Sequence, residues 1–297
     1  MCFAKKLIFR RTCIPMGLAC FLLATACLPQ KALTVSSTAT LLEGVAKASG
    51  KQSDLRVIRE GMPAYLMLMD GMVEMLPVND RLLLAAAQAY SSFASAFAEE
   101  EDPEYAKILY ARSKGYALRS LEARGMKDPV DRSLDSFDNG LHSLRERDAP
   151  YLFWAAASWG SWIRMNLDSM DALAQLPRVE RMMRRVIELD EAYYYGGAHL
   201  FMGIWFASRP RMAGGDLKKA EQHFLRAIDL GEGKFLMAHV YYANFYARPS
   251  LDRNLFVSTL EMVLESPPDV SPELTLMNTV AQKRAKELLS HVEEYFE

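Results

Sequence analysis

From about Leu41 onward, apolar residues recur at helical spacing, and this periodicity constrains the fold of the chain more than any other feature. In one segment the apolar positions are Leu82, Ala85, Ala86, Ala89, Tyr90, Phe93 and Phe97. Residues that return every three to four positions lie on one face of a helix. No convincing run of alternating apolar and polar residues, the pattern of a half-buried strand, interrupts the series. The sequence therefore predicts an all-α body.

Capping residues support this assignment. A side chain that can cap a helix, or a proline suited to the first helical turn, precedes several periodic segments. Five such starts are Asn79-Asp80, Asp102-Pro103, Asp148-Ala149-Pro150, Gly214-Gly215-Asp216 and Ser271-Pro272-Glu273.

The size and charge of the chain exclude some classes of protein. With 297 residues, of which 51% are hydrophobic, it can bury a helical core without disulfides or metal ions, so we expect no cofactor. Its 35 basic and 37 acidic residues give a net charge of −2, with no long run of either sign. The broad basic surface of a nucleic-acid-binding protein is absent, so nucleic acid is not an expected partner.

The first 30 residues have the composition of an export signal. An uncharged stretch over residues 12–30 follows four basic residues, Lys5, Lys6, Arg10 and Arg11, as in a signal peptide. An uncleaved anchor helix is the alternative, because 19 uncharged residues approach the minimum for a membrane span. Pro15 and the small residues that follow it argue against that anchor.

The uncharged stretch contains the sequence Leu22-Leu23-Ala24-Thr25-Ala26-Cys27, which resembles the lipobox of bacterial lipoproteins. We expect residues 1–26 to be a lipoprotein signal peptide, residues 27–44 the lipidated cysteine and its tether, and residues 45–297 a single α-helical domain. Cys20, after Gly17-Leu18-Ala19, is the alternative modified residue. Acyl chains on Cys27 would hold the protein on a membrane.

Internal similarity suggests repeated helix pairs. Gly203 and Phe206 lie on one predicted helix, and Ala220, Phe224 and Ala227 follow on the next with the spacing of a tetratricopeptide (TPR) repeat. Weaker copies include Ala106, Tyr110 and Ser113, then Val179, Met183 and Val186, then Phe256, Leu260 and Val263. We therefore predict stacked antiparallel helix pairs with cryptic TPR-like repeats, an architecture that serves binding.

Aromatic-rich segments suggest where a ligand could bind. The predicted helix near Tyr194 has two apolar faces, so that one can pack while the other borders a cavity. The candidate cleft residues are Trp154, Trp162, Tyr195, His199, Phe206, Tyr242 and Tyr246. The alternative is that these rings form part of the core, where most large aromatic side chains lie.

A search for catalytic and metal-binding motifs finds none. The five histidines are scattered, and the chain lacks H-E-x-x-H, G-x-S-x-G, Walker A and G-x-G-x-x-G. The acidic run at residues 99–102 is interpreted as a solvated helix end, and Asn278 and Gln282 as partners of each other or of a neighbouring subunit. We expect no catalytic residues, no metal site and no enzymatic activity.

Three long segments of the chain resemble the TatT lipoproteins associated with tripartite ATP-independent periplasmic (TRAP) transporters. They are AYSSFASAFAEEED at 89–102, the segment from YLFWAAASWG to QHFLRAI at 151–228, and LMNTVAQKRAKELL at 276–289. The strings YYYGGAHLFMG and NTVAQKRA are the most distinctive. The lipobox departs from the usual pattern, because Ala24 stands three residues before the cysteine and leucine is one residue further back.

The resemblance implies a lipid-anchored periplasmic protein, on the inner or the outer membrane, that assembles as a homotrimer. It also implies binding to the soluble substrate-binding subunit of a TRAP transporter, with a hydrophobic organic acid as a further ligand. A generic TPR scaffold lipoprotein, which binds peptides of the cell envelope and no small molecule, is the alternative function.

Overall fold

A computed structural model of the chain describes residues 44–297, and the fold is all-α, as the sequence predicted. The chain divides into two units, Met1–Gly44 and Val45–Glu297, and everything below concerns the second. The predicted signal peptide, Cys20 and Cys27 lie outside the described residues. No β-strand occurs within residues 44–297.

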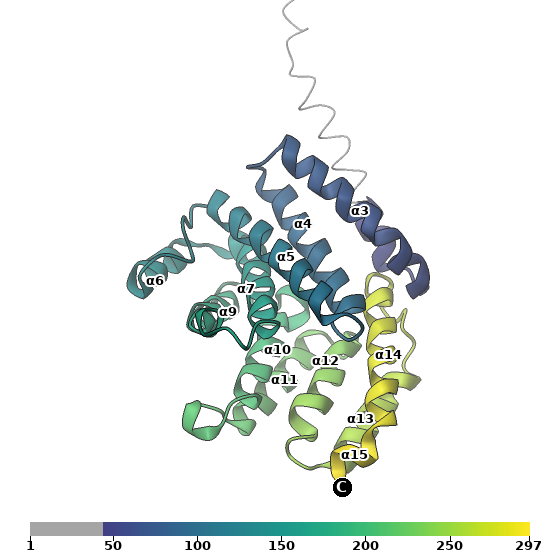
Figure 1. Cartoon of the computed structure of the whole chain (residues 1–297). Coiled ribbons are helices and arrows are strands. Elements are labelled where there is room, and N and C mark those ends of the chain that lie inside the picture. The colour runs from purple at the N-terminus through teal and green to yellow at the C-terminus, as the bar shows by residue number, and fades with distance from the viewer. Residues whose placement is uncertain (1–43) are drawn as a thin grey trace, which may run out of the picture. The chain divides into compact units, whose positions relative to one another are not determined.

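Helices follow one another with short connections (Figure 1). The α-helices are α3 (Leu55–Met75), α4 (Asp80–Phe93), α5 (Pro103–Ala123), α6 (Leu134–Ser143), α7 (Ala149–Arg164), α8 (Met170–Leu173), α9 (Leu176–Asp190), α10 (Tyr193–Ala207), α11 (Leu217–Leu230), α12 (Leu236–Tyr242), α13 (Arg253–Glu265), α14 (Thr275–Ser290) and α15 (Val292–Phe296). Two π-helices, η2 (Ala94–Ala98) and η5 (Ala243–Ala247), continue α4 and α12. Short 3-10 turns are η3 (Glu146–Asp148), η4 (Arg211–Ala213) and η6 (Pro272–Leu274).

Several predicted caps start the helices as expected. The side chain of Asn79 accepts a hydrogen bond from the backbone N–H of Leu82 at the start of α4, and Asp102 caps α5 before Pro103 in the same way. Asp216 caps α11. Asp148 differs: it makes no capping bond to α7, and its carboxylate binds Arg124 instead.

Consecutive helices pack as pairs, with the closest packing between α4 and α5 and between α10 and α11. In the second pair Ala220, Phe224 and Ala227 are fully buried. A Cβ atom on Gly203 of α10 would lie 2.7 Å from the Phe224 ring, so glycine permits the helices to approach. The helix pair at these repeat positions is thus closely packed, whereas assignment to the TPR class stays a prediction.

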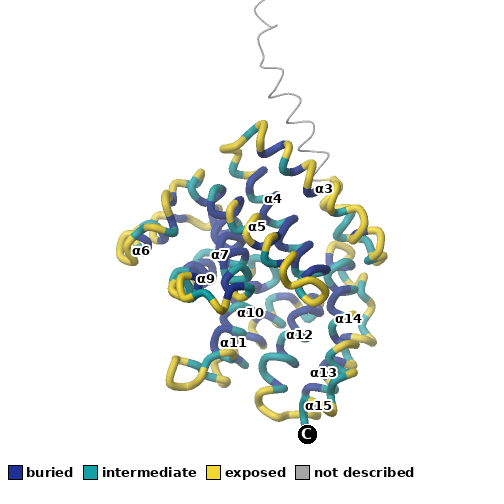
Figure 2. The backbone as a smooth tube through the Cα atoms, in the orientation of Figure 1, coloured by how far each residue is buried: buried dark blue, intermediate teal, exposed yellow. Residues whose placement is uncertain are grey.

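Helix α7 is buried along most of its length at the centre of the helices, while the outer sides of α3 and α6 are exposed (Figure 2). The Asp70 carboxylate of α3 accepts hydrogen bonds from Tyr90, Tyr116 and Arg112 of α4 and α5. These three donors hold the first helix against the next two.

Helix α14, near the C-terminus, returns to the first helices of the domain. Arg284 donates a hydrogen bond to the backbone carbonyl of Ser95 at 2.6 Å, and Lys283 lies 3.3 Å from the carboxylate of Glu101. Arg59 of α3 binds the same carboxylate. This return brings α14 beside the first helices, and a cavity that is partly open to solvent lies among the helices.

Candidate functional site

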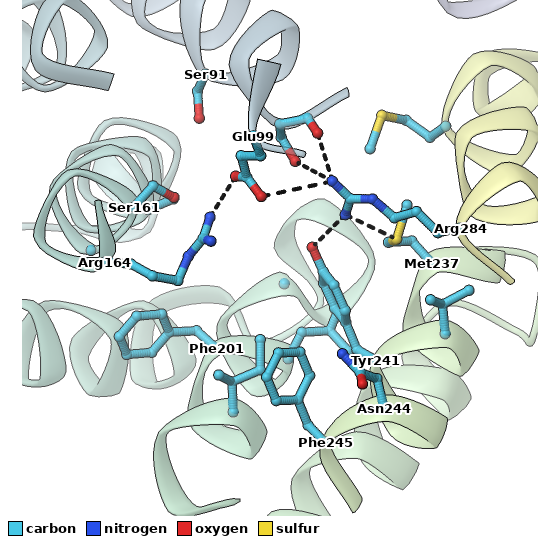
Figure 3. A pocket seen from close by; sticks show the side chains of 18 of the residues that line it. Ser91, Glu99, Ser161, Arg164, Phe201, Met237, Tyr241, Asn244, Phe245 and Arg284 are labelled. Atoms are coloured by element: carbon cyan, nitrogen blue, oxygen red, sulfur yellow. Dashed lines mark hydrogen bonds and ion pairs between the residues drawn. The ribbon is translucent and has the colours of Figure 1, made fainter. Parts of the chain in front are cut away.

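The cavity has a volume of about 740 Å³, within the range of small-molecule sites. Its wall is built from α4, η2, α5, α7, α9, α10, α12, η5, α14 and α15, together with residues that directly follow η2, α10 and α14 or precede α12. Figure 3 shows a charged group at one side and aromatic rings at the other. The cavity is therefore amphipathic.

Two π-helices contribute to the wall at corresponding places in two helix pairs. The sequence ASAFA forms η2 between α4 and α5, and ANFYA forms η5 between α12 and α13. Each is followed within a few residues by an aspartate cap, Asp102 or Asp252. Ser95 and Asn244, the second residue of each π-helix, both line the cavity. Because π-helices are frequent at functional sites, this repetition makes the cavity a candidate functional region.

A left-handed turn forms a third irregularity of the wall. Tyr194, Tyr195 and Gly196 have φ angles of 52°, 57° and 70°. Left-handed backbone is costly for a tyrosine, and such strain is concentrated at functional sites. The turn directs the Tyr194 ring against Trp154 and Phe235, with ring centroids 5.0 and 6.1 Å away.

The apolar wall comes from one face of each of three helices. Helix α7 contributes residues 153, 154, 157 and 160, α10 residues 197, 200, 201 and 204, and the last turns of α12 with η5 residues 237, 240, 241 and 245. The side chains that form this wall include Phe153, Trp154, Leu200, Phe201, Ile204, Met237, Val240 and Phe245. The spacing of three to four residues shows that each helix presents a single stripe.

The polar side centres on Glu99, directly after η2. Glu99 accepts a hydrogen bond from the Tyr110 hydroxyl and lies 2.5 Å from Nη2 of Arg164. Arg284 is 3.8 Å from Glu99, and its Nε is 3.3 Å from Glu100. Tyr241 places its hydroxyl 3.5 Å from Arg284. Two carboxylates and two guanidiniums thus meet at the cavity wall (Figure 3).

The electrostatics of this group follow from burial and from the ion pairs. Burial, together with the charge of Glu99, raises the pKa of Tyr110 well above its ordinary value, so the phenol stays protonated and donates. Burial disfavours the charged form of Arg164, but the attraction of Glu99 and its neighbours outweighs burial and raises the pKa of Arg164. Arg164 and Arg284 therefore both remain cationic.

The structure brings one of the seven predicted cleft residues, Trp154, to the cavity wall. The Lys114 ammonium lies over the Trp162 ring, 3.6 Å from the ring centroid, and Tyr195 packs on Phe235. Tyr242 and Tyr246 stack on each other with centroids 5.1 Å apart.

The remaining two, His199 and Phe206, lie on the side of α10 that packs against α11, where each contacts His223. The sequence predicted two apolar faces on this helix, either of which could border the cavity. The face with Leu200, Phe201 and Ile204 borders the cavity, because the other is occupied by α11.

Glu99 and Arg284 are charged residues of the cavity wall that the sequence interpretation missed. The acidic run was expected to be solvated, yet only 13% of the Glu99 side chain is exposed. The sequence contained one signal for the position of Glu99, because the acidic run directly follows the segment ASAFA. The two arginines that contact Glu99, however, lie 65 and 185 residues further along the chain. The structure also corrects the expectation for Asn278 and Gln282, which bond to backbone groups of neighbouring segments and not to each other.

A histidine pair lies between α10 and α11, outside the cavity wall. The Nδ1 atoms of His199 and His223 are 2.8 Å apart, and Nε2 of His199 is 3.3 Å from Glu191. Because a carboxylate only accepts, neutral His199 carries its proton on Nε2, and its Nδ1 accepts from His223. Burial, together with repulsion from His199 in its protonated form and from Arg184, lowers the pKa of His223 to about 4.

This pair predicts that the domain loses stability as the pH falls. An unfolded histidine has a pKa of about 6.5, so between pH 6.5 and about 4 the unfolded chain binds more protons than the folded one. The melting temperature should therefore decrease between about pH 7.5 and about pH 5. In His223→Gln, which retains a donor, the decrease should be smaller; an equal decrease in both proteins would exclude the pair as its source.

Among the described residues, no three His, Cys, Asp or Glu side chains are arranged to hold a metal ion. Over the same residues no helix is long and apolar enough to cross a membrane.

Comparison with known proteins gives two matches. The sequence model of the TRAP transporter T-component family matches residues 51–296. A protein of Treponema pallidum (strain Nichols), described as an uncharacterized protein, is 24% identical over 266 residues, which cover 83% of this chain and 81% of that protein.

Proposed function

The chain belongs to the TRAP transporter T-component family, and from this premise we propose that it is a lipid-anchored periplasmic accessory protein of a TRAP-type solute transporter. In this role it binds the soluble substrate-binding subunit and holds a hydrophobic organic acid in its cavity. The proposed role is binding without chemical turnover.

The amphipathic cavity is the observation that carries the ligand part of this proposal. Aromatic and aliphatic side chains form most of its wall, and at one side two guanidiniums meet the carboxylates of Glu99 and Glu100, with N–H groups of Arg164 left unused. A ligand with an apolar body and one acidic group matches this distribution. Three backbone irregularities at the wall agree with a site shaped for binding.

Binding of the partner is tested by co-purification. The full chain and the substrate-binding subunit of a TRAP transporter from the same organism, each purified in folded form, should form a complex at tens of micromolar in size-exclusion chromatography. A substrate-binding protein from an unrelated transporter serves as the control. A clean failure to form the complex would contradict the proposed partner, and binding of unstructured envelope peptides instead would favour the scaffold alternative.

The lipid anchor gives a separate prediction. Cys27→Ser should abolish labelling with a radioactive fatty acid and move the protein from the membrane fraction to the soluble fraction, because the acyl chains provide the membrane affinity. Cys20→Ser should leave both unchanged. The opposite pattern would assign the modified residue to Cys20.

For the homotrimer, we propose that α3 provides the contact between copies. Its outer side carries exposed apolar or small residues at alternating spacings of four and three: Val57, Gly61, Ala64, Leu68, Gly71 and Met75. This is the pattern of a helix that packs against another helix. A Cβ on Gly61 or Gly71 would meet nothing within 4 Å, so no contact within the chain requires glycine there.

Each glycine inside a helix costs about 1 kcal/mol relative to alanine, and close approach by a second copy would offset that cost. Leu68→Glu should therefore reduce the mass measured by light scattering from trimer to monomer. Leu225→Glu on α11 is the matched control, since both leucines are 47% exposed. A trimer that persists in Leu68→Glu would exclude this contact.

A further inference from the structure

Arg164 is enclosed by protein atoms, yet its side chain remains accessible to a ligand. As the last residue of α7 it is surrounded by protein atoms deep in the fold. Nevertheless 47% of its side chain is accessible, because the side chain borders the cavity. Figure 3 shows the guanidinium directed toward Glu99, with Phe201 on the cavity side below it.

The guanidinium of Arg164 has donors to spare. It carries five N–H groups, and within residues 44–297 one of its nitrogens, Nη2, makes a hydrogen bond, to Glu99. Arg284 differs, because its guanidinium contacts Ser95, Tyr241 and Glu100, and only 12% of its side chain is accessible. Arg284 therefore holds α14 in place, while Arg164 can still bind an additional group.

The Glu99 carboxylate already has hydrogen-bond and ion-pair partners and therefore has little capacity left to bind a cation. Its carboxylate receives the Tyr110 hydroxyl and Arg164 and lies close to Arg284, with 13% of the side chain accessible. Glu100 lies against Arg284. Glu100 and Glu287 also line the cavity on the α14 side, and 42% of the Glu100 side chain is exposed. On the α7 side, beside Glu99, the unused hydrogen-bonding capacity is thus that of the Arg164 guanidinium.

Apolar surface begins immediately beside this donor. Phe201 and Ile204 of α10 line the wall near α7, and a Cβ on Gly160 would lie 3.1 Å from the Phe201 ring. Gly160 thereby lets the ring lie flush against α7, one turn before Arg164. A ligand that contacts Arg164 with its head group therefore places its body on aromatic and aliphatic side chains.

We propose that Arg164 binds the carboxylate of a monoanionic amphiphile whose apolar body occupies the cavity, through the N–H groups that Glu99 leaves unused. This inference rests on the proposed function, to which it adds the residue that selects the head group. Guanidinium suits this task because its planar fork matches the two oxygens of a carboxylate.

The test compares three probes with the same chain length by isothermal titration calorimetry on the full chain: decanoate, 1-decanol and decyltrimethylammonium. Wild-type protein should bind decanoate more tightly than either other probe. Arg164→Gln should weaken decanoate about 10- to 100-fold, the range for a lost charged hydrogen bond, and leave 1-decanol unchanged. Arg164→Lys should restore part of the loss. Arg209→Gln, outside the cavity wall, is the control.

Removal of Arg164 alone leaves Glu99 without its closest cation, so the double variant Glu99→Gln with Arg164→Gln guards against misfolding. It should retain 1-decanol binding and lose the preference for decanoate. Equal decanoate affinity in wild type and folded Arg164 variants, tighter binding of the cationic probe, or no binding of decanoate would each overturn the assignment. None of these results affects co-purification with the substrate-binding subunit, so the two proposals fail separately.

Discussion

Phe224→Ala is expected to lower the free energy of unfolding by about 3–5 kcal/mol, the range for truncation of a buried phenylalanine. The side chain is fully buried between α10 and α11, its ring lies against Gly203, and Tyr242 lies 6.2 Å away between ring centroids. Since these two helices are closely paired, the remaining space cannot collapse easily. Urea unfolding followed by far-ultraviolet circular dichroism measures the change.

Leu225→Ala provides the control for Phe224→Ala. Leu225 is the next residue of the same helix and is 47% exposed, so its truncation should cost less than about 1 kcal/mol. A Phe224→Ala protein within about 1 kcal/mol of wild type would contradict the central place of this ring in the pair.

Asn278→Leu is expected to cost about 3 kcal/mol or more. The Asn278 side chain is fully buried and joins three segments: it accepts from the backbone N–H of Leu236 and donates to the backbone carbonyls of Lys234 and Pro268, each at 3.0 Å. Leucine has a similar volume but removes all three hydrogen bonds, each of which contributes about 0.5–1.5 kcal/mol, and it leaves the buried N–H of Leu236 without a partner.

The same unfolding measurement tests Asn278→Leu, with Thr279→Val as its control. Thr279 bonds only to the carbonyl of Thr275 within its own helix, so its loss should cost less than about 1 kcal/mol. If the two variants were equally stable, Asn278 would not be the residue that holds the α12 start and the loop before α14 together.

The helical content and several helix starts could be predicted because they depend on local features. Asn79, Asp102 and Asp216 cap the helices that were assigned to them, since a side-chain oxygen needs only the next few backbone N–H groups. The burial of Phe224 was likewise predictable from its spacing with Ala220 and Ala227.

The lining of the cavity was not predictable to the same degree. Both faces of α10 are apolar, so periodicity could not tell which would meet α11 and which the cavity. The left-handed turn at Tyr194 and Tyr195 has no clear sequence signal either, because only Gly196 is a residue that favours such backbone. The sequence analysis likewise chose Tyr242 and Tyr246, whereas Tyr241 and Phe245 line the cavity. The periodicity of α12 and η5 did not show which of their sides would face it.

The sequence by itself thus determined which segments are helical, where several of them start, and which family its distinctive strings belong to, because each of these is written in neighbouring residues. The tertiary structure alone decided that Glu99, Arg164 and Arg284 meet beside an apolar cavity. Arg284 reaches Ser95 across 189 residues of chain, and a contact of that separation depends on how the whole series of helices curves and closes.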